Sequence, residues 1–274
     1  MKAKSRARYI IAALALAVLV MALVCLFVGA SRMSFSDGVA ALFGKGSAAN
    51  VRILRSIRVP RVLAALIAGA ALSVSGLVMQ TTLSNAMASP STMGVSNAAV
   101  FGANLSIIVF AGGFLSTGNN LASYTAGVNP FAASVTAFLF SALSILLILA
   151  LCRVKAFSPN VVVLAGIAVG AIWTAATTLL QFYATDVGLS AAVVWNFGDL
   201  GRATYKTDLL MFCAAAPGLA VFSALAWRYN ALLSGDAAAG SMGVNVSRLR
   251  FFSLLLASLM TAACVSSLGI IGFV

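Results

Sequence analysis

Seven long apolar runs dominate this sequence. A helix needs about 20 apolar residues to cross the roughly 30 Å hydrocarbon core of a bilayer. Because 62% of the residues are hydrophobic and only 8% are charged, too little charge remains to cover a soluble globular domain or to keep a chain disordered. We therefore expect an all-α polytopic membrane protein with about seven transmembrane helices. They are predicted near residues 9–30, 62–83, 94–114, 130–152, 160–183, 207–227 and 249–273.

The charges that flank these runs predict their orientation. Basic residues precede the first run, which is longer than the apolar part of a secretory signal and has no clear A-x-A cleavage site after it. We therefore expect a first transmembrane helix with a cytoplasmic N-terminus. Cytoplasmic loops should be rich in Lys and Arg. On this topology they hold Arg153, Lys155, Arg228, Arg248 and Arg250.

The loop over residues 31–61 breaks this pattern. With a cytoplasmic N-terminus it lies outside, yet Asp37 is its one acidic residue among many basic ones. External cations of this kind could hold an acidic partner or bind the phosphates of lipids, and the residues alone favour neither. The basic residues of the loop are Arg32, Lys45, Arg52, Arg55, Arg58 and Arg61.

Two predicted helices carry stripes of small and polar residues. At about 100° per residue, the members of each stripe fall on one helix face. Small residues allow close helix packing in lipid, whereas part of such a stripe could instead line a transport pathway. The amides of Gln80 and Gln181 favour a pathway slightly, because an amide that faces lipid is costly. The stripes are Gly69, Ser73, Gly76 and Gln80, and Gly166, Gly170, Trp173, Thr177 and Gln181.

Two polar interruptions separate the runs. Residues 84–94 form an uncharged break, and residues 234–244 form a helix-capable stretch inside a predicted cytoplasmic loop. In the second, Asp236 is expected to cap a short helix that extends through Ala239, and Gly243 is expected to end it. Such a helix could be the contact for a soluble partner or a simple connector.

The composition also limits the chemistry. The chain has no His, and its five acidic residues are all Asp, so little is left for a metal site or for acid–base catalysis. The net charge of +12 includes no dense basic run that a nucleic acid could use. No G-x-x-x-x-G-K-[ST] motif occurs, so a nucleotide would have to be bound by another chain. Cys25, Cys152, Cys213 and Cys264 are isolated and are interpreted as small apolar fillers.

The order of several short motifs resembles the FecCD-type permease family, the membrane subunits of ABC importers for iron-siderophores, haem and cobalamin. Ala86 and Met87 depart from the family's usual Pro and Leu. The resemblance covers residues 52–274 and implies a single permease domain over 1–274. The matching residues are Arg58-Val-Pro-Arg61, Gly69, Gly76, Gln80, Asn85, Ala88, Pro90, Gly94-Val-Ser96, Leu164-Ala-Gly166, Trp195-Asn-Phe-Gly198, Gly235-Asp236, Ala239, Met242-Gly-Val244, Gly269 and Gly272-Phe-Val274.

The resemblance implies a role for each group of residues. Arg58 and Arg61 match positions that dock an extracytoplasmic substrate-binding protein, and the segment with Gly235, Asp236, Ala239 and Gly243 matches the one that contacts the ABC ATPase subunit. Gate or pathway residues are expected at Gln80, Asn85, Met87, Pro90 and Gln181.

The family also implies an assembly and a location. Two permease copies pair in the membrane lipid, as a homo- or heterodimer, and the pathway follows their interface. No cofactor is expected on this chain, because ATP binds the partner subunit, and no metal, catalytic residue or nucleic acid is expected either. The implied location is the bacterial cytoplasmic membrane. The implied function is import of an iron chelate or cobalamin without catalysis by this chain.

An ion-coupled secondary transporter and an intramembrane enzyme are the two alternative functions. An ion-coupled secondary transporter usually places ionisable residues within its helices, and here they lie near loops. An intramembrane enzyme would need an embedded nucleophile and base, and a chain without His and without paired carboxylates offers little for this.

The family usually has ten helices and continues beyond the G-F-V motif. We therefore expect a C-terminal part of the family fold to be missing from this chain. We also expect the 274-residue form not to support uptake.

Overall fold

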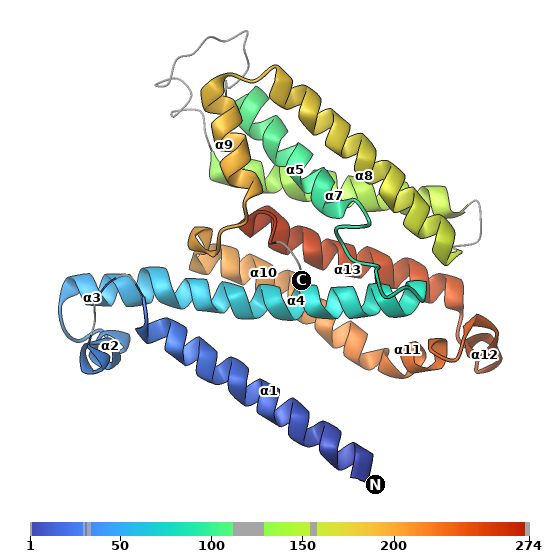
Figure 1. Ribbon diagram of the computed structural model, residues 1–274, viewed down its shortest axis with the longest axis horizontal. Helices are drawn as coiled ribbons and strands as arrows, with labels where there is room; N and C mark the ends of the chain where they lie inside the picture. The colour runs from blue at the N-terminus through green and yellow to red at the C-terminus, as the bar shows by residue number, and fades with distance from the viewer. Residues whose placement is uncertain (1, 30, 32–33, 112–128, 154–157, 272–274) are drawn as a thin grey trace. The chain divides into compact units, whose positions relative to one another are not determined.

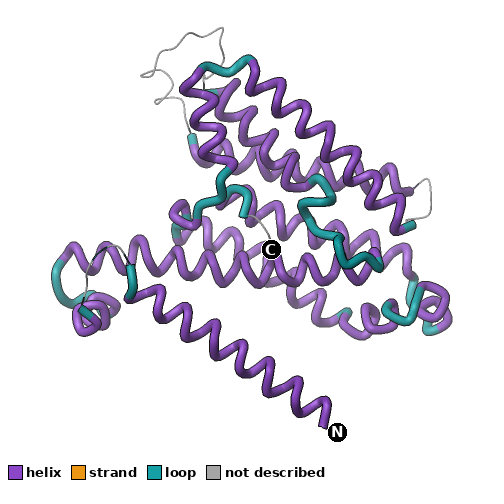
Figure 2. The backbone as a smooth tube through the Cα atoms, viewed as in Figure 1, coloured by secondary structure: helices purple, strands orange, loops and turns teal. Residues whose placement is uncertain are grey.

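In the residues that it describes, the computed structural model consists of helices joined by turns and loops, and Phe197 and Ile270 form an isolated β-bridge (Figure 2). This confirms the predicted all-α class. Arg32, Lys155 and residues 272–274 of the last motif lie outside the described residues. These are 2–29, 31, 34–111, 129–153 and 158–271.

The chain forms two compact units. The first comprises Met1–Leu66 and Leu200–Asp208. It contains the long helix α1, three short helical segments in the loop that breaks the positive-inside rule, and the start of α4 (Figure 1). Its elements are α1 (Lys2–Phe27), α2 (Phe35–Leu42), α3 (Ala48–Arg52), the π-helix η1 (Ile53–Arg58), the first residues of α4 (Val59–Leu83) and the 3₁₀ turn η4 (Leu200–Arg202).

The second unit comprises Ile67–Asp199 and Leu209–Val274. It holds the rest of α4 and the helices that follow (Figure 1). These are α5 (Val95–Asn104), the π-helix η2 (Leu105–Phe110), α7 (Pro130–Arg153), α8 (Pro159–Phe182), α9 (Asp186–Asn196), most of α10 (Tyr205–Ala224), α11 (Ala226–Leu232), α12 (Asp236–Ser241) and α13 (Val246–Leu268).

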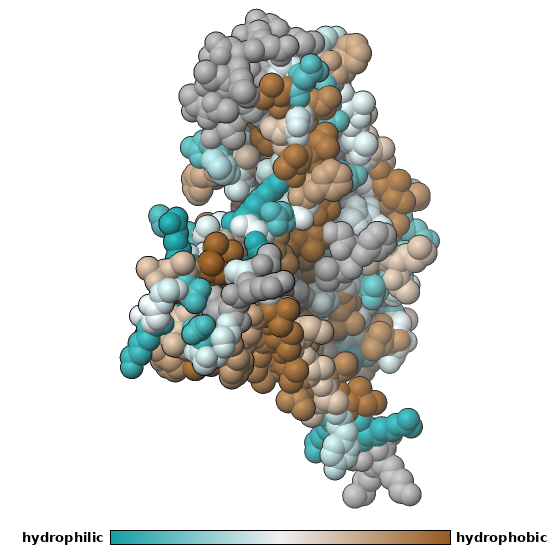
Figure 3. Space-filling view, turned by 60° about the vertical axis from the view of Figure 1, so that its left-hand side comes forward, coloured by the Kyte–Doolittle hydropathy of each residue, from teal (hydrophilic) through white to brown (hydrophobic). Residues whose placement is uncertain are grey.

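Six helical segments of the described chain are long and apolar enough to cross a membrane. Figure 3 shows hydrophobic side chains over much of the face that it presents, as expected for a surface in contact with lipid. The remaining predicted run, 94–114, corresponds to the shorter apolar helix Val95–Phe110. At 1.5 Å per residue this segment is about 24 Å long, less than the hydrocarbon thickness. The six spans are Arg8–Phe27, Ala48–Leu83, Pro130–Arg153, Pro159–Phe182, Tyr205–Ala224 and Val246–Leu268.

Local sequence explains where several of these helices begin. Pro130 and Pro159 are the first residues of α7 and α8, where the missing N–H of proline costs nothing. The side chains of Thr185 and Asn245 accept hydrogen bonds from the third residue of α9 and of α13. These caps satisfy backbone donors that the first turn of a helix leaves free.

Helix α5 lies at the centre of the second unit and contacts α7, α8, α9 and α13. Its buried face is rich in alanine, and Ala99 and Ala103 belong to the main apolar cluster with Ile108 and Trp195. Gly102 faces the α7 backbone so closely that an added Cβ would lie 2.5 Å from the carbonyl oxygen of Thr136. Small residues therefore allow the close helix approach that substitutes for a hydrophobic driving force in lipid.

Candidate functional site

The uncharged break after α4 is a compact turn held by its own side chains. It leaves the helix at Ser84, which has φ 49° in the left-handed region that non-glycine residues seldom adopt. The Asn85 side-chain oxygen accepts a bond from the Met87 amide (2.9 Å), and the Gln80 amide donates to the carbonyl of Ala86 (3.0 Å). The structure therefore brings the predicted gate residues Gln80, Asn85 and Met87 together.

The second half of this segment is equally well bonded. The hydroxyl of Thr92 accepts from the Ser89 amide (2.9 Å), and the hydroxyl of Ser89 accepts from the Thr92 amide (3.2 Å). Pro90 between them is buried. Met87 is 82% exposed. A rigid turn thus presents one large, flexible apolar side chain, which is a suitable form for a residue that closes a pathway.

Gly94 lies between this segment and α5, and its backbone is in close contact with α8. It has φ 68°, and a Cβ there would lie 2.9 Å from the Cα atom of Gly170 and 3.0 Å from the Gly166 carbonyl oxygen. The amide of Asn97 donates to the Gly170 carbonyl at 3.3 Å. Gly166 and Gly170 of the second stripe therefore allow close packing of α8 against Gly94, as in the helix-packing interpretation of that stripe.

The first stripe differs from the second. Hypothetical Cβ atoms on Gly69 and Gly76 would meet nothing within 4 Å among the described residues. Gln80, at the end of the same stripe, is exposed. This face of α4 is thus available to a pathway or to another chain.

Gln181 lies apart from the other predicted gate residues. It is about 16 Å further along α8 than Gly170, which contacts Gly94. Its amide donates to Asn104 (3.1 Å), and the Asn104 amide donates to Asn196 (3.0 Å). The amide of Gln181 therefore joins α8 to α5 and α9, and its expected place in the pathway stays a prediction.

The predicted coupling segment contains the short helix α12. Gly235, with φ 99°, is its N-cap, and Asp236 is its first residue rather than its cap. At the other end, the amides of Gly243 and Val244 donate to the carbonyls of Gly240 and Ala239. With Gly243 at φ 84°, this is a Schellman ending. Gly243 thus ends the helix as predicted, and buried Ala239 fixes its inner face.

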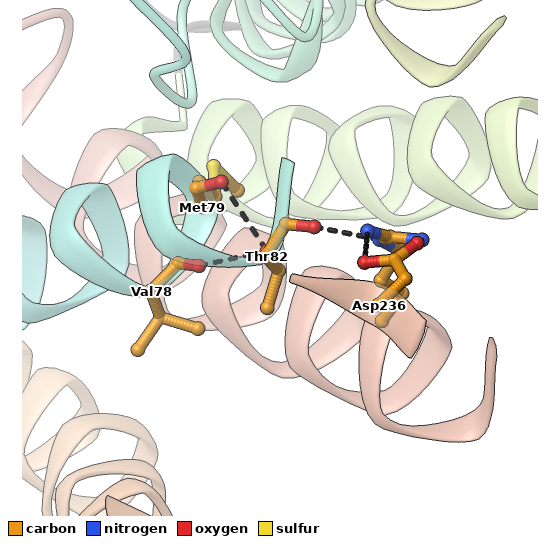
Figure 4. Close-up of polar contacts among 5 residues, drawn as sticks. Val78, Met79, Thr82 and Asp236 are labelled. Carbon is orange, nitrogen blue, oxygen red and sulfur yellow. Dashed lines mark hydrogen bonds and ion pairs between the residues drawn. The ribbon is translucent and has the colours of Figure 1, made fainter. Parts of the chain in front are cut away.

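Asp236 does not cap α12 because its carboxylate binds Arg250 of α13 (Figure 4). The two nitrogens Nη1 and Nη2 of Arg250 donate to the two carboxylate oxygens at 2.9 and 2.8 Å. The Nε atom donates to the carbonyl of Thr82 near the end of α4 at 2.6 Å. From the sequence, Arg250 is predicted only to be one of the basic residues that orient the chain in the membrane. The available signal was an arginine close to the start of an apolar helix.

The neighbouring helix α11 is also joined to α13. The hydroxyls of Tyr229 and Ser253 are 2.7 Å apart, and both residues are buried. Burial raises the pKa of the Tyr229 hydroxyl, and the hydrogen bond with Ser253 opposes this shift. The phenol therefore stays neutral at physiological pH and acts as a hydrogen-bonding group.

The outer arginines have two different environments in the first unit. Arg58 is 8% exposed, and its guanidinium donates to the carbonyls of Leu26, Phe27 and Ser31 and to the Ser31 hydroxyl, at 2.7–3.1 Å. Cations are favoured at helix C-termini, so Arg58 stabilises the end of α1. This burial leaves little of the Arg58 side chain accessible to a partner, and its expected docking role stays a prediction.

Arg55 has a similar internal role, whereas Arg61 does not. The Arg55 guanidinium donates twice to the Leu42 carbonyl at the end of α2, at 3.0 and 2.7 Å. The Tyr205 hydroxyl donates to the Arg55 carbonyl at 2.6 Å. Arg61 and Arg52 are exposed. The basic residues of this loop are thus of two kinds, since Arg55 and Arg58 bind the ends of helices whereas Arg52 and Arg61 are exposed.

The FecCD transport family model matches residues 16–274 of this chain. The chain belongs to the FecCD family. This agrees with the resemblance carried by its short motifs and with its multi-pass helical structure. FecCD is a transport family.

Three FecCD-like relatives are named as permease proteins. One from Methanocaldococcus jannaschii, provisionally named an ABC transporter permease protein, is 42% identical over 91% of this chain. A provisionally named iron chelatin transport system permease protein of Helicobacter pylori is 34% identical over 81%. The hemin transport system permease protein of Yersinia pestis is 33% identical over 80%. The chain spans 70%, 62% and 62% of their respective lengths.

A solved structure has the same fold. It is described as an inward-facing conformation of a transporter provisionally assigned to the metal-chelate ABC type. The TM-score is 0.79 at 24% identity, and the match covers 97% of this chain and 77% of the other. This likeness shows that the two chains share a fold.

Proposed function

We propose that this chain is the membrane permease subunit of an ABC importer for an iron chelate, haem or cobalamin. The observation that carries the proposal is its membership of the FecCD family, with relatives named as permease proteins of transport systems for iron chelatin and hemin. The chain would form the conduit in the cytoplasmic membrane with a cytoplasmic N-terminus. A separate ATPase would supply the energy, and an extracytoplasmic binding protein would deliver the substrate.

The two ends of the conduit have candidate residues. Residues 84–94, with exposed Met87, are suited to a cytoplasmic gate. Helix α12, short and largely exposed, is suited to contact the ATPase. The open face of α4 around Gly69 and Gly76 is suited to the second permease copy or to the substrate path. Gln181 acts in helix packing in this proposal.

The test is uptake by proteoliposomes that contain a partner ABC ATPase, the binding protein and a permease of the relatives' full length that includes this chain, because the 274-residue form is not expected to support uptake. We expect uptake of one labelled substrate, which is a ferric siderophore, haem or cobalamin. Uptake should occur only when ATP is present on the side of the membrane that bears the ATPase. Vesicles without the ATPase are the control. Uptake that continues without ATP would contradict the proposal.

An ion-coupled secondary transporter remains the second candidate because of one residue. Asp208 is 4% exposed, and among the described residues its two carboxylate oxygens have no hydrogen-bond partner. Buried, unpaired carboxylates are a feature of proton relays in membranes. A transporter of this kind would lose uptake when a protonophore is added and when Asp208 is replaced by Asn, at constant ATP. The ABC importer would not.

Arg61 is the arginine of the predicted pair that can test docking of the binding protein. We expect Arg61→Glu to reduce the association rate about tenfold at low salt, because it replaces attraction to acidic groups by repulsion. The difference should shrink as the salt concentration rises. Surface plasmon resonance on nanodiscs would measure it. Lys206→Glu, an exposed change in the same unit, is the matched control, and an equal effect of both variants would point to general charge attraction instead.

A further inference from the structure

Arg250 is a charged side chain in a buried position. It lies in the second turn of α13, and its side chain is 4% exposed. A buried charge is costly unless it is paired and hydrogen-bonded. The contacts of Arg250 must therefore supply this pairing.

The first of these contacts joins α13 to α12. Both terminal nitrogens of Arg250 donate to the two oxygens of Asp236, at 2.9 and 2.8 Å. Such a bidentate pair fixes direction as well as distance. Asp236 is the first residue of α12, where the helix dipole favours a negative charge. Its side chain is 53% exposed, so the pair connects the surface of the coupling segment to the interior.

The second contact joins the same guanidinium to α4. Nε of Arg250 donates to the Thr82 carbonyl at 2.6 Å. The last four carbonyls of a helix have no partner within it, and Thr82 is the second-last residue of α4. The Thr82 hydroxyl is used elsewhere, donating to the carbonyls of Val78 and Met79. Figure 4 shows Thr82 and Asp236 on opposite sides of this junction.

The junction directly precedes the candidate gate segment. Two residues after Thr82, the chain turns at Ser84 with φ 49° and enters the bonded turn that presents Met87. A displacement of α12 would therefore be passed through one planar, hydrogen-bonded guanidinium to the residues from which the gate segment starts. Coupling by loose apolar contacts would not have this fixed direction.

We propose that Arg250 is a positioning residue that transmits movement of the ATPase-contacting helix α12 to the gate segment 84–94. This inference rests on the proposed function. Lys cannot replace Arg250, because an ammonium on a flexible stem cannot hold two carboxylate oxygens and a carbonyl in one plane. Charge alone is then insufficient, and the geometry of the fork is what couples the elements.

The experiment compares uptake with ATP hydrolysis in a reconstituted complex of the ATPase, the binding protein and a permease of the relatives' full length that includes this chain. For Arg250→Lys we expect complex assembly and ATP hydrolysis within twofold of the parent, and at least tenfold less substrate imported per ATP. Asp236→Asn should reduce the same ratio less, about threefold, because the side-chain amide oxygen of asparagine can still accept one hydrogen bond from Arg250. Arg248→Lys is the matched control, since Arg248 is exposed on the same helix, and it should keep the parental ratio.

The outcomes separate the two claims. A parental complex without ATP-dependent uptake would refute the proposed function and this inference with it. A parental import ratio in Arg250→Lys would refute the inference alone. Loss of assembly in both Arg250→Lys and Asp236→Asn would also overturn it, because the junction would then only hold the fold together.

Discussion

Replacing Gly102 by alanine is expected to destabilise the protein by about 3 kcal/mol, a large effect for one methyl group. The added Cβ would lie 2.5 Å from the Thr136 carbonyl oxygen and 2.8 Å from its carbon. Both atoms belong to the α7 backbone, so no side chain can move aside and the two helices must separate. Separation would loosen the apolar cluster that contains Ala99 and Ala103.

Gly76→Ala is the matched control for this substitution. It is the same chemical change in a helix, and its Cβ would meet nothing within 4 Å among the described residues. We expect unchanged stability or a gain of up to about 1 kcal/mol, from the better helix propensity of alanine. Thermal unfolding of both variants in the same detergent measures the difference. Equal transition temperatures would disprove the close contact of α5 with α7.

Replacing Arg58 by alanine is expected to cost about 3 kcal/mol of local stability at the end of α1. The substitution removes all four hydrogen bonds of the guanidinium at once. It leaves carbonyls of Leu26, Phe27 and Ser31 without a donor, and hydrogen bonds to a charged group are each worth about 1.5–3 kcal/mol. The site is 8% exposed, so water would replace these bonds poorly.

Limited proteolysis after α1 and hydrogen exchange of the amides near its end measure this effect. Arg58→Ala should be cleaved and should exchange at least tenfold faster there. Arg61→Ala, at an exposed position of the same motif, should behave like the parent. Identical protection of the two variants would mean that Arg58 is free, and the docking role first expected for it would have to be considered again.

Some features of the molecule follow from local sequence alone. The membrane-spanning helices were predictable because the length of an apolar run is a local property, and it can be compared directly with the thickness of the hydrocarbon core. The end of α12 was predictable for a similar reason, since Gly243 can adopt φ 84° without strain. The short segment Val95–Phe110 shows the limit of this reasoning. Its apolar run continues beyond the end of the described helix.

The roles of individual polar side chains were decided by the tertiary structure. Arg58 and Arg61 belong to one R-x-P-R motif, yet only one of them reaches the end of α1. Gln80 and Gln181 have the same side chain, yet one supports the turn after α4 and the other binds Asn104. Helix periodicity places a residue on a face without stating which helix lies opposite.

Arg250 gives the clearest case of this division. Its charge, its helix and its predicted cytoplasmic side could all be read along the chain. Its partners could not, because Thr82 is 168 residues away and the carbonyl that it offers is a backbone group present in every residue. Side-chain chemistry and the length of an apolar run are properties of neighbouring residues, so the sequence determined the class of protein and its membrane-spanning segments. Which buried donor meets which acceptor depends on how distant helices pack, and only the tertiary structure decided it.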